Sequence, residues 1–134
     1  MRHPLIATVA ATGLLVGTAL APATAVAQAE TSQVLKTELQ GEEGREANIV
    51  RFEVGPDWET DRHIHPGHVF VYILDGTIEI DVEGKDPQTF SAGEAFYELP
   101  DVAMVARTAG SEEGATFIVF QVGPSGEPLM VPTQ

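Results

Sequence analysis

Cysteine is absent from all 134 residues of this chain, and its absence removes several classes of chemistry. Without thiols, the chain forms no disulfides, zinc–thiolate sites or thiolate clusters, and has no cysteine nucleophile. Glycine-rich phosphate loops and the nucleophile elbow of serine hydrolases are also missing. In an oxidising compartment, a domain of this kind must be stabilised by its core alone.

Basic residues are scarce as well. The chain has 7 Lys and Arg against 20 Asp and Glu, which gives a formal net charge of −13. Such a surface repels polyanions, so nucleic acid and anionic lipid surfaces are excluded as partners. The length suits one domain rather than two, and 43% hydrophobic residues is ordinary for a folded chain.

The first 29 residues have the layout of a secretory signal peptide. A basic start at Arg2 precedes an uncharged stretch over residues 5–20, and a small-x-small motif ends at Ala29. The alternative is an uncleaved membrane anchor, but the apolar stretch is short for a spanning helix. We therefore predict cleavage after Ala29 and a single domain of residues 30–134. That domain is expected to be secreted or periplasmic, without stable membrane association.

Alternating apolar and polar residues dominate the rest of the chain. Residues 49–54 and 77–83 alternate with period two, which is the pattern of half-buried strands. Residues 69–74 are continuously apolar, which predicts a central strand covered on both faces. The intervening Asp75 and Gly76 favour a type I′ turn, and thus a hairpin.

The remaining segments also indicate strands, and no segment shows a helical period. Many short strands at regular spacing predict an all-β barrel or sandwich. After Gly123, the Pro-rich tail predicts an ordered edge that frays into a loose terminus. Trp58 is expected in a loop near the barrel mouth, where it either packs at an edge or covers the pocket. The further strands are expected near residues 34–39, 87–91, 95–99, 103–107 and 115–122.

Three histidines, His63, His65 and His68, lie within six residues. Side chains two apart in a strand share a face, so His63 and His65 are placed to converge as two imidazole ligands of a metal. Pro66 and Gly67 then turn the chain. His68 opens the next strand, where it either reaches the same site or points to solvent. The alternative for the whole cluster is a solvated polar loop.

Two stretches resemble the sequence motifs of the cupin family. H-I-H-P-G at residues 63–67, followed by F-V-Y-I-L-D-G at residues 70–76, is similar to the first cupin motif. G-E-A-F-Y-E-L-P at residues 93–100 is similar to the start of the second. The resemblance covers roughly residues 45–122 and implies a small double-sheet β-barrel of the jelly-roll type. It also implies that two copies pair into a homodimer.

The resemblance places His63 and His65 on the two metal-binding histidines of the family. The family's glutamate ligand falls on Val69 and its third histidine on Met104, so this chain lacks both ligands. Glu98 is the candidate replacement, because it interrupts an apolar strand and a carboxylate inside a barrel needs a partner or a metal. The alternative for Glu98 is an outward position or a hydrogen bond at the barrel mouth.

His68 and Met104 complete the set of candidates. A bulge would turn His68 inward, where it would act as a metal ligand or proton shuttle. Met104 has a soft thioether that would suit copper together with the two histidines, or it packs in the core.

Three functions stay open at this point. The first is a metal-dependent enzyme acting on a small molecule, with Fe, Mn, Ni, Zn or Cu held by His63, His65, His68 and Glu98, and with His68 and Glu98 catalytic. The second is a metal-free barrel that binds a small ligand or a partner. The third is a copper-handling protein. The interior of the metal-free barrel would be lined by Val69, Val71, Ile73, Phe96 and Met104.

Overall fold

The computed structural model describes residues 29–110 and 112–134, and these residues form an all-β fold, as predicted. The predicted signal peptide, residues 1–29, lies outside the described residues except for Ala29. No helix in the described part of the chain is long and apolar enough to cross a membrane. The strands are β1 (Glu30–Glu38), β2 (Arg45–Val54), β3 (His63–Ile64), β4 (His68–Asp75), β5 (Thr77–Val82), β6 (Gln88–Ser91), β7 (Ala95–Glu98), β8 (Met104–Thr108), β9 (Ala115–Pro124) and β10 (Val131–Pro132).

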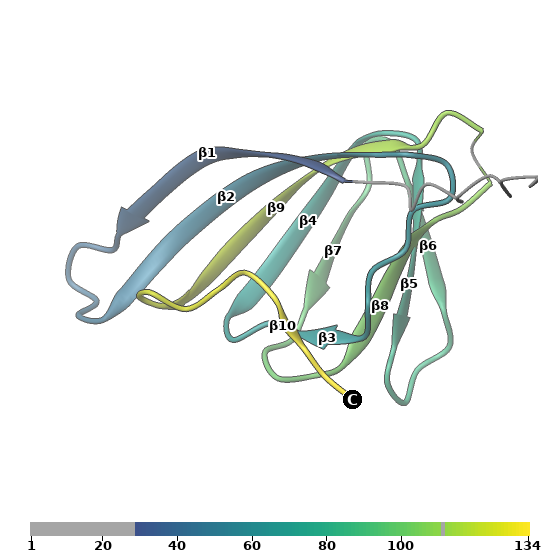
Figure 1. Ribbon diagram of the computed structural model, residues 1–134. Coiled ribbons are helices and arrows are strands. Elements are labelled where there is room, and N and C mark those ends of the chain that lie inside the picture. Colours follow the sequence, from purple (N-terminus) through teal and green to yellow (C-terminus); the bar gives the residue numbers. More distant parts are fainter. Residues whose placement is uncertain (1–28, 111) are drawn as a thin grey trace, which may run out of the picture.

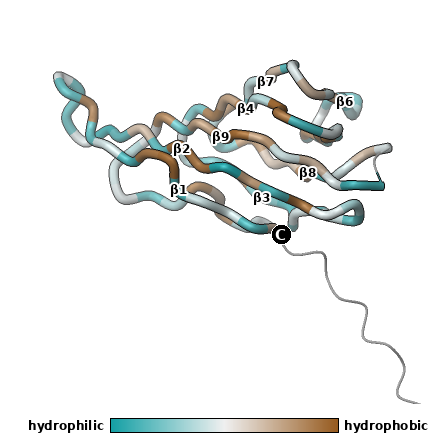
Figure 2. The backbone as a smooth tube through the Cα atoms, turned by 90° about the horizontal axis from the view of Figure 1, so that it is seen from above, coloured by the Kyte–Doolittle hydropathy of each residue, from teal (hydrophilic) through white to brown (hydrophobic). Residues whose placement is uncertain are grey.

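Two five-stranded antiparallel sheets make up the predicted double-sheet jelly roll (Figure 1). One sheet has the order β1-β2-β9-β4-β7 and the other β10-β3-β8-β5-β6. The core lies between them, and hydrophobic stretches run along β2, β4 and β9 (Figure 2). Its buried residues are Val50, Phe52, Val54, Trp58, Val69, Val71, Ile73, Ile78, Ile80, Ala115, Phe117 and Val119.

Strand β4 is covered on one face only. Val69 and Ile73 are fully buried, whereas Phe70 and Tyr72 are 46% and 48% exposed. The prediction that this strand is covered on both faces is therefore wrong for the single chain. A continuous apolar run shows that neither face of the strand carries charged side chains. It does not show that other parts of the same chain cover both faces.

The predicted hairpin at Asp75 and Gly76 is also wrong, because β4 and β5 belong to different sheets. A type I′ turn needs a positive φ at both central residues, but only Gly76 has one, at 76°. A Cβ atom at Gly76 would lie 2.3 Å from the Gly114 carbonyl oxygen. The position is therefore a tight crossover in which the chain leaves one sheet for the other.

The C-terminal tail is fixed rather than loose. Strand β10 pairs with β3, where Val131 lies opposite Ile64 and Pro132 opposite His63. The Thr133 amide donates to the Arg62 carbonyl over 2.9 Å. The tail therefore runs beside β3 at the lower end of the barrel in Figure 1, where it borders the histidine pair.

Candidate functional site

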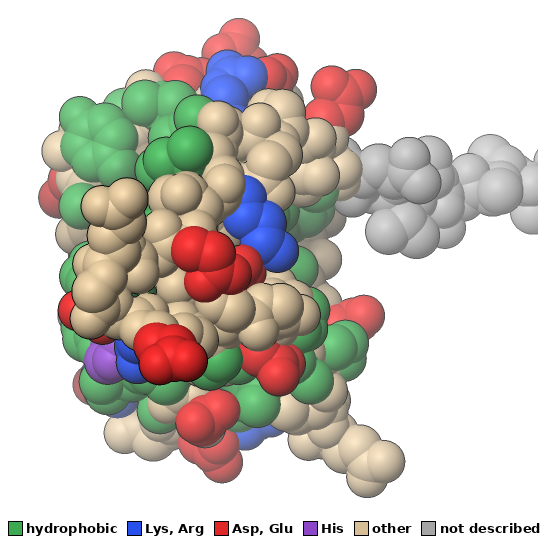
Figure 3. All heavy atoms as spheres, turned by 90° about the vertical axis from the view of Figure 1, so that its left-hand side faces the viewer, with side chains coloured by type: hydrophobic (Ala, Val, Ile, Leu, Met, Phe, Trp, Pro, Cys, Tyr) green, Lys and Arg blue, Asp and Glu red, His purple; other side chains and the backbone are tan. Residues whose placement is uncertain are grey.

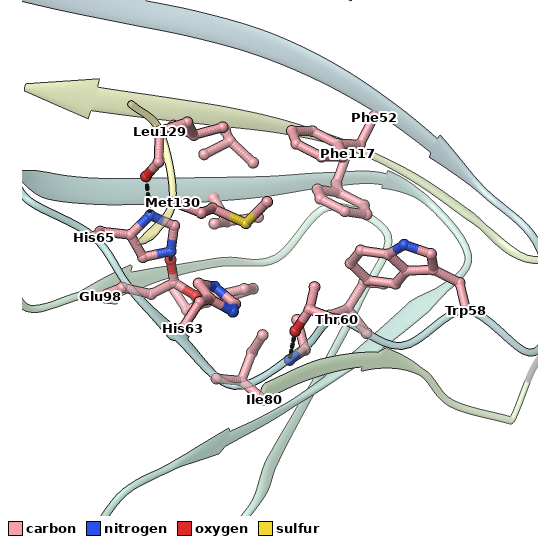
Figure 4. Close-up of a pocket in the computed structure, with 15 residues that line it drawn as sticks. Phe52, Trp58, Thr60, His63, His65, Ile80, Glu98, Phe117, Leu129 and Met130 are labelled. Carbon is pink, nitrogen blue, oxygen red and sulfur yellow. Dashed lines mark hydrogen bonds and ion pairs between the residues drawn. The ribbon is translucent and has the colours of Figure 1, made fainter. Parts of the chain in front are cut away.

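An apolar pocket with one polar end lies between the two sheets (Figure 4). His63, His65 and Glu98 gather at one end, and Trp58 stands at the other. The pocket volume is about 40 Å³. The lining residues are Phe52, Trp58, Thr60, His63, His65, Val71, Ile78, Ile80, Phe96, Glu98, Ala106, Phe117, Leu129, Met130 and Val119.

His63 and His65 converge as the period-two pattern predicts. Both are buried, and their rings meet edge to face with centroids 4.9 Å apart. The Nδ1 atom of His63 donates to the Asp61 carbonyl over 2.8 Å, and that of His65 to the Leu129 carbonyl over 2.7 Å. Because a carbonyl only accepts, each Nδ1 carries the proton, and each Nε2 is the atom left for another partner.

Glu98 points into the barrel, which excludes the outward position that was one of the alternatives for it. It is 6% exposed, and its Oε2 lies 3.1 Å from the Nε2 of His65. With Nδ1 already donating, a neutral His65 and an ionised Glu98 would oppose two acceptors. The contact therefore needs a proton or another cation between the two side chains.

His63 is held in its neutral form. Burial lowers its pKa below the ordinary value of 6.5, and the neighbouring His65 acts in the same direction. The hydrogen bond to the Asp61 carbonyl and the charge of Glu98 oppose this shift in pKa without cancelling it. At neutral pH, the Nε2 of His63 is consequently a hydrogen-bond acceptor or a metal donor.

The structure does not bring His68 to this site. Its side chain is exposed on the outer face of β4, and the β4–β9 register is regular from His68 to Ile73, so the bulge needed to turn it inward is absent there. Its Nδ1 instead lies 2.5 Å from the Tyr97 hydroxyl, and the two rings stack.

Met104 is fully buried opposite His63 in the β3–β8 register, but it does not line the pocket. Of the predicted apolar lining, Val71 and Phe96 face the pocket, whereas Val69 and Ile73 pack behind it. Within residues 29–110 and 112–134, no three His, Cys, Asp or Glu side chains are arranged to hold a metal ion.

Sequence reasoning placed Trp58 near the barrel mouth, but it missed Thr60 in the same loop and the pocket residues of the tail. The loop before β3 is fixed to β8, since the Thr60 amide donates to the Ala106 carbonyl and the Thr108 amide to the Trp58 carbonyl. These bonds hold Trp58 in the core rather than at an edge. Leu129 and Met130 lie 64 or more residues from His65 in sequence, so no local pattern could indicate them.

The sequence matches the cupin domain family over residues 50–120, which is more than half of the chain. The chain therefore belongs to the cupin family. No curated protein matches it in sequence.

Solved structures with this fold are similar to it at low sequence identity. A conserved protein with a double-stranded β-helix domain from Klebsiella pneumoniae has a TM-score of 0.62 and 19% identity, covering 84% of this chain and 89% of that one. A cupin 2 domain-containing protein from Halorhodospira halophila has a TM-score of 0.60 and 19% identity, covering 81% and 71%. The DMSP lyase DddQ from Ruegeria pomeroyi has a TM-score of 0.58 and 20% identity, covering 78% and 51%. At these identities, the likeness establishes the fold alone.

Proposed function

We propose that this cupin binds a small, uncharged molecule in its barrel pocket, with the molecule's polar end at His63, His65 and Glu98. The observation that carries the proposal is a buried cluster of three ionisable side chains inside otherwise apolar walls. Buried polar groups are costly unless they are paired, and ligand pockets combine such groups with apolar walls. Among the described residues, the Nε2 of His63 has no hydrogen-bond or ion-pair partner, whereas the Nε2 of His65 contacts Glu98.

The walls favour an uncharged ligand. Among the described residues that line the pocket there is no Lys or Arg, so nothing compensates an anionic group. Glu98 is already engaged by His65. A neutral molecule with one hydroxyl or carbonyl group therefore fits this lining better than a carboxylate or phosphate.

A divalent metal is the second candidate occupant of the polar end. Both imidazoles donate through Nδ1 to backbone carbonyls, which is how metal-ligating histidines are oriented. As they stand, these side chains are not arranged to hold an ion, so a site made of His63, His65 and Glu98 would form only when Glu98 exchanges its contact with His65 for the ion. The chemistry that such an ion supplies is polarisation of a substrate carbonyl or enolate, which would make the protein an enzyme.

Metal analysis separates the two candidates. Protein purified without chelator or histidine tag is reconstituted with Fe, Mn, Ni, Zn or Cu, and its metal content is measured by elemental mass spectrometry. About one equivalent of a single metal that is lost in a His63→Ala/His65→Ala double variant, but kept in His68→Ala, supports the metal site. No uptake in the unmodified protein contradicts it and leaves the metal-free pocket.

Binding itself is tested with phenol as the probe. Trp58 is the chain's only tryptophan and lines the pocket, so its emission reports occupancy. We expect saturable quenching that weakens at least about tenfold in His63→Ala, which corresponds to one lost hydrogen bond of about 1.4 kcal/mol. Equal affinity of both proteins for phenol would contradict the proposed role of the polar end.

We also propose that two copies pair through the outer face of β9, β4 and β7. Apart from His68, the outward side chains of β4 as far as Leu74 include no acidic or basic residue, and none stands at Tyr97 or at Ile118, Phe120 and Val122. In a chain of net charge −13, this face is where two copies meet without opposing carboxylates. In Figure 3, hydrophobic side chains gather at the upper left of the view, and acidic ones spread over its centre and lower part and along its upper edge.

The dimensions of this face suit a homodimer. Three strands spaced about 4.8 Å apart over roughly 20 Å give an apolar centre of about 300 Å², around which an interface of about 800 Å² per copy can form. Phe70 stacks on Tyr97 with ring centroids 5.1 Å apart, so the surface is already ordered. Sedimentation at tens of micromolar is expected to show a dimer that Phe70→Lys converts to monomer, while Thr89→Lys on the other sheet leaves it intact. A monomeric unmodified protein would contradict this pairing.

Export is the remaining part of the proposed function. Strand β1 begins at Glu30, directly after the predicted cleavage position, so cleavage after Ala29 would leave the strand whole. Amino-terminal sequencing of protein expressed with residues 1–29 in a bacterial host is expected to begin at Glu30 in the periplasmic or secreted fraction. Full-length protein retained in the membrane fraction would contradict it.

A further inference from the structure

A second cavity adjoins the barrel pocket at its mouth. Its volume is about 320 Å³, against about 40 Å³ for the pocket. A volume of about 40 Å³ holds only about three water molecules, whereas sites for small organic ligands run from about 300 Å³ upward. The pocket alone therefore holds little more than the polar end of a ligand such as phenol, and the mouth cavity provides space for the rest of the molecule.

The two cavities share one wall. Both are lined by Phe52, Trp58, Thr60, His63 and Met130. Phe52, Trp58 and His63 are between 4% and 8% exposed and are fixed in the core or by hydrogen bonds. Met130 is 37% exposed, and its unbranched side chain has three rotatable bonds. Among these shared residues, Met130 therefore has the side chain that can most readily change its conformation.

The backbone at Met130 is nevertheless held on both sides. The Leu129 carbonyl accepts the hydrogen bond from His65, and Val131 pairs with Ile64 in the β10–β3 ladder. Rotation of the Met130 side chain therefore opens the wall without release of the tail. All of these tail residues lie beyond the stretch that matches the cupin domain family, which ends at residue 120.

We infer that the pocket and the mouth cavity form one elongated binding site, in which Met130 sets the length of ligand admitted. This inference rests on the proposed function and adds a substrate class to it. The polar end of the ligand lies at His63, and an apolar body extends past Met130 into the mouth cavity. Apart from Asp61, the described lining of the mouth cavity carries no acid or base other than His63, which favours an uncharged arylalkyl or alkyl body.

The experiment uses the mature chain, in which cleavage removes only the small Ala29 side chain from the lining of the mouth cavity. The probes are phenol, benzyl alcohol, phenethyl alcohol and phenylpropanol. Trp58 lines both cavities, so its emission reports on every member of the series. In Met130→Ala, we expect affinity to rise by about fourfold per added methylene, the gain for a freely buried CH₂ group. In the unmodified protein, the rise is expected to level off after benzyl alcohol.

One control variant keeps the outcome interpretable. Val131→Ala removes a neighbouring tail side chain that lines neither cavity. It is expected to retain the unmodified ratio of phenylpropanol to phenol affinity. Thermal unfolding checks that Met130→Ala is folded.

The result that overturns the inference alone is a phenylpropanol-to-phenol ratio that is the same in Met130→Ala and the unmodified protein, while phenol still binds. A series that leaves Trp58 emission unchanged in both proteins overturns the inference together with the proposed function. The proposed function fails separately, when His63→Ala leaves phenol affinity unchanged while the ratio still responds to Met130. The two failures are therefore distinguishable in one set of titrations.

Discussion

On each face of β7, one side chain contacts a histidine, and the two contacts differ in burial. Inside the barrel, His65 meets Glu98, and both side chains are about 5% exposed or less. Outside, His68 meets Tyr97, the residue before Glu98, and both are exposed. The residues of the two contacts are close neighbours in the sequence, so burial, and not sequence position, distinguishes the candidate site from the surface contact. The following predictions test this difference, beginning with the largest expected effect.

Adjacent residues of β4 should differ most in their contribution to stability. Ile73 is fully buried, so Ile73→Ala should lower the free energy of unfolding by about 3.5 kcal/mol through lost burial and a cavity. Tyr72 is 48% exposed, and Tyr72→Ala should cost about 1 kcal/mol or less where the protein is monomeric. Urea unfolding measures both. Equal losses would mean that both faces of the strand are covered.

Removal of the inner carboxylate should have the next largest effect. Glu98→Ala leaves the buried His65 without its partner, and should lower the free energy of unfolding by about 3 kcal/mol. Glu98→Gln is the matched control, because its amide N–H donates to a neutral His65 and should restore most of the loss. A fully stable Glu98→Ala protein would contradict the role of this contact.

The stability of the fold should depend on pH through His63. Its pKa in the folded state is lowered below 6.5, mainly by burial, so below that pH the unfolded chain binds a proton that the folded chain resists. Stability should therefore fall as pH decreases from about 7 toward about 5. Chemical unfolding across this range should show a weaker dependence for His63→Asn, whose amide still donates to the Asp61 carbonyl. Identical pH dependence would contradict the lowered pKa.

The outer histidine contact should matter least. Tyr97→Phe removes the hydroxyl that His68 meets on an exposed surface, and should change the free energy of unfolding by about 0.5 kcal/mol or less. Thermal unfolding at low protein concentration measures this change. A loss of stability as large as that of Glu98→Ala would show that the exposed His68–Tyr97 contact stabilises the fold as much as the buried His65–Glu98 contact, and would contradict this comparison.

The sequence predicted the sheet architecture and much of the polar end, because both follow from period two. Odd-numbered residues from His63 to Ile73 face inward, and this parity alone separates His68 from His63 and His65. The Asp75–Gly76 prediction failed because turn chemistry is local, whereas the choice between a hairpin and a crossover depends on which strands pair across the whole chain. Leu129 and Met130 were missed because their contacts to the pocket arise from tertiary structure.

Nitrogen NMR of the histidine rings during a phenol titration tests the central claim most directly. The account predicts that His63 carries its proton on Nδ1, and that the Nε2 signals of His63 and His65 shift as phenol is added while those of His68 stay unchanged. A titration that shifts the His68 signals and leaves the inner pair unaffected would contradict the claim that the buried end of the barrel is the binding site.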